Sequence, residues 1–437
     1  MPNPFNHKKT LQSISQVLIK AVFLVVIWIP NLIVIQNYFP YLINTKTLQS
    51  NLLARDFAFL DTAKYYACAQ IAKAAPKDIW NPDILQNWFK DYLKISKPAD
   101  QDIINKVGYS PCTPQSVVIF MPLTNLPLNK VIIILEILTL IILITPATIL
   151  VRKHFNFTTP QIIYWWLIVL AAAPATMNFY YGQLDGLLAG LAAMFLLTWQ
   201  NKNGFLGAVC LALTLAIKPQ RALIMLIMSL ADRRFRLLFW TLLISIILVV
   251  LTIMVLGLEP FLMYPNKLEC IYRAIDNHTL PDTAYATASA LGPISLIYGL
   301  GVAHMLSLPA TIISLAGAYV IWRKAIQSGK HAYPFAYASS VLFIFIFAPL
   351  QHFYSLILLC IVWACTVPTI SIEKILKIKE YSLRYWCFLF LFFPALTWII
   401  SYLACFNGFP GLGHLSILLV MFFLSLFCFR QSIRSAR

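Results

Sequence analysis

Two cationic side chains interrupt a long apolar stretch of this chain. Lys218 and Arg221 lie three residues apart in the motif KPQR, and the residues around them, 204–231, are otherwise largely apolar. Charged groups inside such a segment are costly and usually mark a binding site or a pathway. Preorganised cations stabilise the charge on a phosphate leaving group. These two residues are therefore candidates for binding a phosphate, with snorkelling to a membrane surface as the alternative.

A second polar group opens another apolar segment. Gln183 and Asp185 lie at the start of GQLDGLLAGL, where their amide and carboxylate groups could face a polar cavity shared with Lys218 and Arg221. The alternative for Asp185 is a solvated carboxylate at a helix N-terminus, where the helix dipole favours negative charge.

Two aspartates earlier in the chain could act as general bases. Asp61 begins the stretch DTAKYYACAQIAKAAPKDIW, which is typical of a helix that Pro76 ends. Tyr65 follows four residues later and could share a helix face with Asp61. Asp56 is the reserve candidate for the base. Asp61 could instead serve only as the N-cap of its helix.

Two further candidates lie at or near the ends of apolar segments. Glu136 is near the start of the segment 131–151, where a hydrogen bond between helices is the alternative role. His352 is in the stretch FAPLQHFY, where a structural histidine is the alternative.

The elements that must position these residues are membrane helices. Hydrophobic residues make up 60% of the 437, charged residues 11%, and the mean hydropathy is +0.76. A soluble domain cannot bury so much apolar surface. We predict an all-α polytopic integral membrane protein, a single domain over 1–437, with about 12 membrane segments of roughly 20 residues or fewer. The expected segments are 16–37, 131–151, 160–178, 184–199, a hairpin at 204–231, 236–258, 304–322, 333–350, 354–370, 384–402 and 412–429.

The hairpin follows from the charges that flank 204–231. Lys202 and Arg233 both belong on the cytoplasmic side by the positive-inside rule, so the segment between them cannot be one crossing. Two short helices joined at KPQR satisfy this constraint, and they would place Lys218 and Arg221 at membrane depth.

The same rule orients the whole chain. If the N-terminus is cytoplasmic, most of the 33 Lys and Arg residues lie on that side, opposed only by Asp232, Glu373 and Glu380. Both termini are then cytoplasmic, and two loops, 38–115 and 259–284, lie outside. Because the bias accounts for the net charge of +17, no nucleic-acid partner is expected. The nine cysteines show no metal-binding spacing, so neither a metal nor another cofactor is expected.

Three blocks of the sequence carry a resemblance to a known family. They are DTAKYYACAQIAKAAPKDIW, then YSPCTPQSVVIFMPLTNLPL, then GQLDGLLAGLAAMFLLTWQNKNGFLGAVCLALTLAIKP, and FAPLQHFY is similar to a later proline-and-histidine motif. The chain resembles the polyprenol-phosphate-dependent mannosyltransferases of glycosyltransferase family 87, which have the GT-C fold. It departs from them in lacking the usual tryptophan before the histidine.

The resemblance implies an inverting membrane glycosyltransferase. Its partners would be a polyprenyl-phosphate sugar donor, in which the sugar is mannose, a lipid or glycan acceptor, and the lipid bilayer. It implies Asp61, or else Asp56, as the base, and Lys218, Arg221 and His352 as phosphate ligands. Sugar or acceptor contacts would come from Gln183, Asp185, Tyr65 and Glu136. The enzyme would work at the plasma (inner) membrane with its active site facing outward.

Two other classes of protein remain open from the residues. A transporter or flippase of lipid-linked sugars would line its path with the same charges, although matched broken helices in the two halves of such a chain are expected and only one broken hairpin is visible. A non-catalytic protein that keeps the fold is the other alternative.

Overall fold

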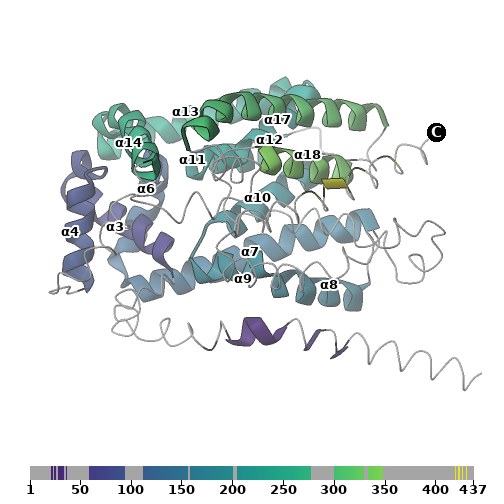
Figure 1. Ribbon diagram of the computed structural model, residues 1–437, viewed down its shortest axis with the longest axis horizontal. Coiled ribbons are helices and arrows are strands. Elements are labelled where there is room, and N and C mark those ends of the chain that lie inside the picture. The colour runs from purple at the N-terminus through teal and green to yellow at the C-terminus, as the bar shows by residue number, and fades with distance from the viewer. Residues whose placement is uncertain are drawn as a thin grey trace, which may run out of the picture.

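The computed structural model describes residues 59–93, 112–155, 158–199, 204–276, 300–328 and 333–347, with individual residues between 21 and 36 and between 419 and 430. Every regular element in these ranges is a helix (Figure 1), as the sequence predicted. The elements are α3 (Leu60–Ala74), η1 (Pro76–Asp78), α4 (Pro82–Leu93), α6 (Pro114–Phe120), η3 (Met121–Asn125), α7 (Leu128–Phe155), α8 (Thr159–Ala171), α9 (Ala173–Tyr180), α10 (Asp185–Thr198), α11 (Phe205–Ile217), α12 (Pro219–Ala231), α13 (Phe235–Leu256), α14 (Glu259–Asp276), α17 (Leu300–Ser328) and α18 (Tyr333–Phe347).

The helices divide into a long bundle and a cap at one end. Helices α7, α8 and α17 lie along the longest axis of the molecule, and α3, α4, α6 and α14 gather at one end of it (Figure 1). The cap contains the helices of the two segments that the sequence predicted as outer loops, 38–115 and 259–284, as far as these are described.

Two of the described helices are long and apolar enough to cross a membrane. They are Leu128–Leu150 within α7 and Phe235–Leu256, with mean hydropathies of 2.5 and 2.8. Four shorter apolar helices, α8, α10, α11 and α12, accompany them. Much of α13 is exposed, including Phe235, Phe239 and Met254, which is the surface expected of a helix in contact with lipid. The total of about 12 segments stays a prediction.

The predicted hairpin at 204–231 is present as two short helices. Helix α11 ends at Ile217, Lys218 has an extended backbone with φ −142° and ψ 89°, and α12 begins at Pro219. Proline is well suited to the first position of a helix because its fixed φ is already helical and its missing N–H has no partner to lose there. The break therefore falls inside the KPQR motif.

One predicted segment is broken where the sequence suggested a continuous helix. The span expected at 160–178 is divided at Ala172 into α8 and α9. Pro174 lies in the first turn of α9, and a proline further inside a continuous helix would remove a hydrogen bond and clash with the preceding turn. The chain therefore ends one helix and starts another.

The buried side chains form two hydrophobic clusters. One fills the bundle around Trp165, Trp199 and Trp322. The other joins the cap to the bundle and includes Tyr65 of α3 and Phe120 of α6, with residues from the start of α10 and from the end of α11. The polar residues singled out in the sequence come together at this junction.

Candidate active site

A buried carboxylate stands at the centre of the candidate site. Asp185 is the first residue of α10 and its side chain is 0% exposed. One oxygen, Oδ2, accepts a hydrogen bond of 2.8 Å from Lys218 Nζ, and the other, Oδ1, accepts one of 2.8 Å from Arg221 Nε. Because Asp185 is enclosed and paired with both cations, it is not the solvated interfacial carboxylate that the sequence left as an alternative.

The break between α11 and α12 delivers both cations to Asp185. Lys218 is the residue between the two helices, and Arg221 lies in the first turn of α12. Their side chains are 9% and 7% exposed, so neither extends to the surface of the protein, as snorkelling would require. Lys218 Nζ also donates to Gln183 Oε1 at 2.9 Å. Four residues that the sequence singled out thus form one hydrogen-bonded cluster.

A tight turn before α10 aims Gln183 and Asp185 at these cations. Gly182 has φ +63°, which is readily available only to glycine. Asn178 closes the turn twice, because its carbonyl accepts from the Gln183 N–H at 2.9 Å and its side-chain Oδ1 accepts from the Gly186 N–H at 3.2 Å. Sequence reasoning missed Asn178, whose only signal was an amide within an apolar segment.

The same turn holds the start of α3. Phe59 N–H donates to the Tyr180 carbonyl at 2.7 Å, and Asp61 N–H donates to the Tyr181 carbonyl at 3.2 Å. Asp61 is therefore not the N-cap. Helix α3 begins at Leu60 after Phe59, and backbone carbonyls of another segment satisfy N–H groups at its start. The side chain of Asp61 is left for another role.

Asp61 lies within electrostatic range of the cluster. Burial raises its pKa above the ordinary value of 3.8, Lys64 and Lys218 act to lower it, and Asp185 acts to raise it further. A helix N-terminus favours the charged form of a carboxyl group, but the cost of burial outweighs that effect at Asp61. A carboxyl group with a raised pKa is a stronger base once it is ionised.

The remaining candidates are placed less directly. Tyr65 is buried, and its ring stacks on Phe120 with 4.9 Å between centroids. Glu136 lies partly exposed on α7, and the structure shows no hydrogen bond or ion pair from it to the other described residues. Asp56 and His352 lie outside the described residues. The ring of Phe345 in α18 lies 5.4 Å from the Arg221 guanidinium, which brings the helix preceding His352 in the sequence to the site.

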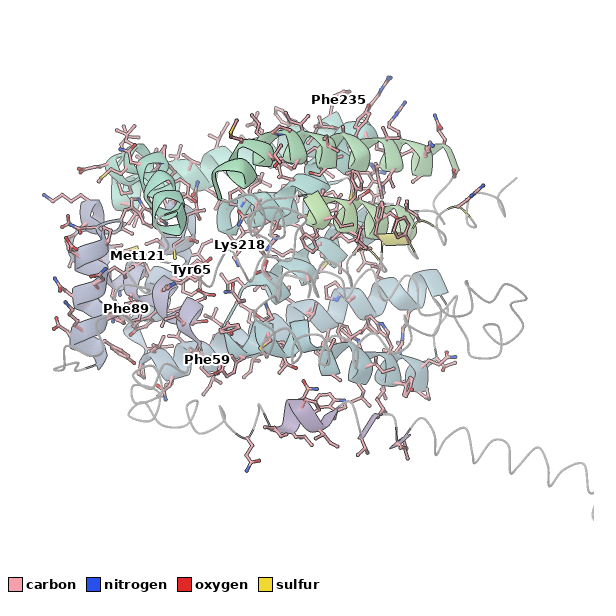
Figure 2. All side chains as sticks on the ribbon, viewed as in Figure 1. Phe59, Tyr65, Phe89, Met121, Lys218 and Phe235 are labelled. Atoms are coloured by element: carbon pink, nitrogen blue, oxygen red, sulfur yellow. The ribbon has the colours of Figure 1, made fainter. Side chains whose placement is uncertain are left out.

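The charges of the cluster suit an anionic ligand. Two cations share one carboxylate, so Lys218, Arg221 and Asp185 together carry one net positive charge. A low dielectric constant strengthens the electrostatic attraction between that charge and a phosphate. Figure 2 shows Lys218 in the interior, between the bundle helices and the cap that carries Tyr65. Among the described residues, no group of three or more His, Cys, Asp or Glu side chains could hold a metal ion.

The part of the chain that contains this cluster matches a known protein family. The model of glycosyltransferase family 87 matches residues 113–350, which is more than half of the 437 residues. The match includes the turn before α10 and the whole of the hairpin. No curated protein and no solved structure shows significant similarity to the chain.

Proposed function

Because the chain belongs to glycosyltransferase family 87, a family of membrane glycosyltransferases, we propose that it transfers mannose from a polyprenyl phosphate to a lipid or glycan acceptor. The observation that carries this proposal is the buried pair of Lys218 and Arg221, held by Asp185 beside Asp61. A phosphate-binding group and a base in one place are what such a transfer needs.

The phosphate of the donor binds to Lys218 and Arg221. Lys218 and Arg221 both donate to Asp185, and charge-assisted hydrogen bonds from lysine and arginine to phosphate oxygens are among the strong ones. As the bond between the sugar and the phosphate breaks, negative charge grows on the phosphate, and fixed cations in a buried site stabilise it. His352 contributes a further hydrogen bond to the phosphate or the sugar.

Asp61 acts as the general base. It accepts the proton of the acceptor hydroxyl as the oxygen attacks the anomeric carbon from the side opposite the phosphate. The bond from that carbon to the phosphate oxygen breaks, polyprenyl phosphate leaves, and the configuration at the carbon is inverted. The proton then passes from Asp61 to solvent. Asp56 is the reserve for this role.

The sugar and the acceptor lie between the base and the phosphate. The amide nitrogen of Gln183 donates hydrogen bonds to sugar hydroxyls. Asp185 accepts hydrogen bonds from the sugar and also orients the cations. Tyr65 and Glu136 contact the sugar or the acceptor further from the cations. Tyr65 belongs to the hydrophobic cluster that joins the cap to the bundle.

The molecule is a single GT-C-like domain over 1–437 in the plasma (inner) membrane. We place both termini in the cytoplasm and the loops 38–115 and 259–284 outside. The cap, which holds α3 and Asp61, is then extracytoplasmic, so transfer takes place on that side. The support for this orientation is the uneven distribution of Lys and Arg.

Transfer from a radiolabelled polyprenyl-phosphate sugar tests the proposal. The purified protein in nanodiscs should move label to lipid or glycan acceptors, and Asp61→Asn should abolish this while Asp83→Asn, an exposed aspartate of the same cap, should not. Movement of intact donor across the bilayer without transfer would favour the flippase alternative instead.

A further inference from the structure

A buried lysine outside the site is joined to it by a chain of contacts. Lys267 of α14 is 7% exposed, and its Nζ donates to the Cys112 carbonyl at 2.7 Å. The same ammonium lies 3.7 Å from the ring centroid of Trp80 and 5.1 Å from that of Tyr264. The Trp80 indole N–H donates in return to the Pro260 carbonyl at 3.0 Å, so α14 is held at two points.

The next link connects this contact to the hairpin. Thr113, which follows Cys112 and is the N-cap of α6, donates its hydroxyl to the carbonyl of Ala216. Ala216 is in the last turn of α11, where carbonyls have no partner within the helix. The break at Lys218 creates this unpaired carbonyl, and Thr113 satisfies it.

If Lys267 only packed two segments together, burying its charge would cost more free energy than burying a neutral side chain. Its electrostatic neighbours among the described residues are Cys68, Cys112 and Lys64, and none of these is a carboxylate. Burial removes the hydration of this ammonium, and among the described residues a carbonyl and two aromatic rings replace it. Buried ionisable groups with strongly perturbed pKa values cluster at functional sites.

We infer that Lys267 is a positioning residue for the phosphate-binding cations, acting through Cys112, Thr113 and Ala216 on the hairpin break that carries Lys218. It does not contact the ligand. Lys267 holds the Cys112 carbonyl, and the adjacent Thr113 holds the carbonyl of Ala216 at the end of α11. The end of α11 in turn determines the position of Lys218. This inference rests on the proposed function of Lys218 and Arg221.

The experiment measures binding of undecaprenyl monophosphate to the full-length protein in nanodiscs. Lys267→Met should weaken binding by about 2- to 30-fold, the range found for residues that modulate a distant site. Its thermal unfolding should stay near that of the wild type, because Met fills a similar volume and removes a buried charge. Lys267→Arg should restore binding. Lys73→Met is the matched control, since Lys73 also donates within the cap, to Asn125 at 2.7 Å, but does not lead to the hairpin.

A double-mutant cycle separates positioning from a local effect. Thr113→Val removes the hydroxyl that bonds Ala216, and Thr113→Ser keeps it. If Lys267 acts through Thr113, combining Lys267→Met with Thr113→Val should cost no more affinity than the larger single change, because contacting residues on one path are not additive. If the affinity losses of the two single variants multiply in the double variant, Lys267 acts by another route and the inference is overturned.

The pH dependence of binding provides a second readout. Burial lowers the pKa of Lys267 to about 8, the thiols of Cys112 and Cys68 act to raise it, and Lys64 acts to lower it; Tyr264 faces the same ammonium. Affinity in the wild type should fall as the pH rises through about 8, and this fall should be absent in Lys267→Arg.

Two different results would contradict the positioning role of Lys267 and the proposed phosphate site separately. If Lys267→Met binds the probe as the wild type does while Lys218→Met has lost binding, the positioning role is wrong and the proposed function stands. If Lys218→Met also binds normally, the proposed phosphate site is wrong as well.

Discussion

The hydroxyl of Thr62 donates a hydrogen bond of 2.8 Å to the carbonyl of Gly182. This contact joins the first turn of a cap helix to the turn that precedes α10. It brings Asp61, which precedes Thr62, to the same region as Gln183 and Asp185, which follow Gly182. The candidate base and the candidate phosphate site therefore depend on one close backbone approach.

Gly182→Ala should disrupt that approach. An added Cβ would overlap Thr62 Oγ1 and lie 3.3 Å from the Phe59 Cα, and the residue would be held at φ +63°. We expect transfer activity to fall at least tenfold and the melting temperature to drop. Gly257→Ala is the matched control, because Gly257 also has a positive φ, +81°, but nothing lies within 4 Å of its added Cβ. With φ +81° and ψ 179°, Gly257 has a backbone conformation essentially restricted to glycine, so the change should cost about 1–3 kcal/mol of stability from the backbone alone. It should leave the relative activity unchanged. Equal losses in the two variants would mean that the approach to Thr62 does not matter.

Lys218→Met should weaken binding of the donor and leave the protein inserted and folded. Hydrogen bonds to charged groups are worth about 1.5–3 kcal/mol, so the dissociation constant should rise by roughly ten- to a hundredfold. Isothermal titration of the protein in nanodiscs measures this. Lys73→Met, on the exposed side of α3, should bind as the wild type does. Normal donor affinity in Lys218→Met would remove Lys218 from the site.

Asp61→Asn should abolish most of the turnover without loss of donor binding. Asn keeps the size of the side chain but not its basicity, and loss of general-base help typically lowers kcat by about 10²–10⁴-fold. Asp56→Asn should have a milder effect. A dead Asp56 variant together with a normal Asp61 variant would reassign the base, and full activity in both would favour a transporter.

The pH profile of kcat/KM should report the environment of Asp61. Burial raises the pKa of this carboxyl group, so activity should fall on the acid side at a higher pH than for an ordinary aspartate. Lys64 acts to lower that pKa, and removing its charge in Lys64→Met should move the acid limb to still higher pH. Lys77→Met, on an exposed lysine of η1, should leave the limb in place. A shift in the opposite direction in Lys64→Met would show that another group controls the profile.

Labelling of single cysteines tests the orientation in the membrane. With an impermeant thiol reagent on intact cells, on a background without other accessible cysteines, Lys90→Cys should react and Ile375→Cys should not. The physical reason is that Lys and Arg are retained on the cytoplasmic side of membrane proteins. Reaction at Ile375→Cys alone would invert the proposed topology and with it the side on which transfer occurs.

The sequence by itself determined the class of the protein and the location of the break in the hairpin. Hydropathy required membrane helices, and the charges on both sides of 204–231 required two short helices in place of one. Pro219 then fixed where the second helix starts. These are local or compositional properties, and a chain shows them without being folded. The sequence also predicted that Gln183, Asp185, Lys218 and Arg221 lie near one another, and the structure joins them in one hydrogen-bonded cluster.

Only the tertiary structure decided how these groups are paired and what each helix end contacts. The N–H groups at the start of α3 are satisfied by the carbonyls of Tyr180 and Tyr181, far along the chain, so Asp61 is not the N-cap that the sequence left as its alternative role. The sequence left open whether Asp185 is solvated or lies with Lys218 and Arg221, and the packing of the helices pairs it with these two cations. The path from Lys267 to Ala216 joins three segments and has no sequence signal. Hydrogen bonds between distant segments depend on how the helices pack, and helix packing is not a property of any one segment.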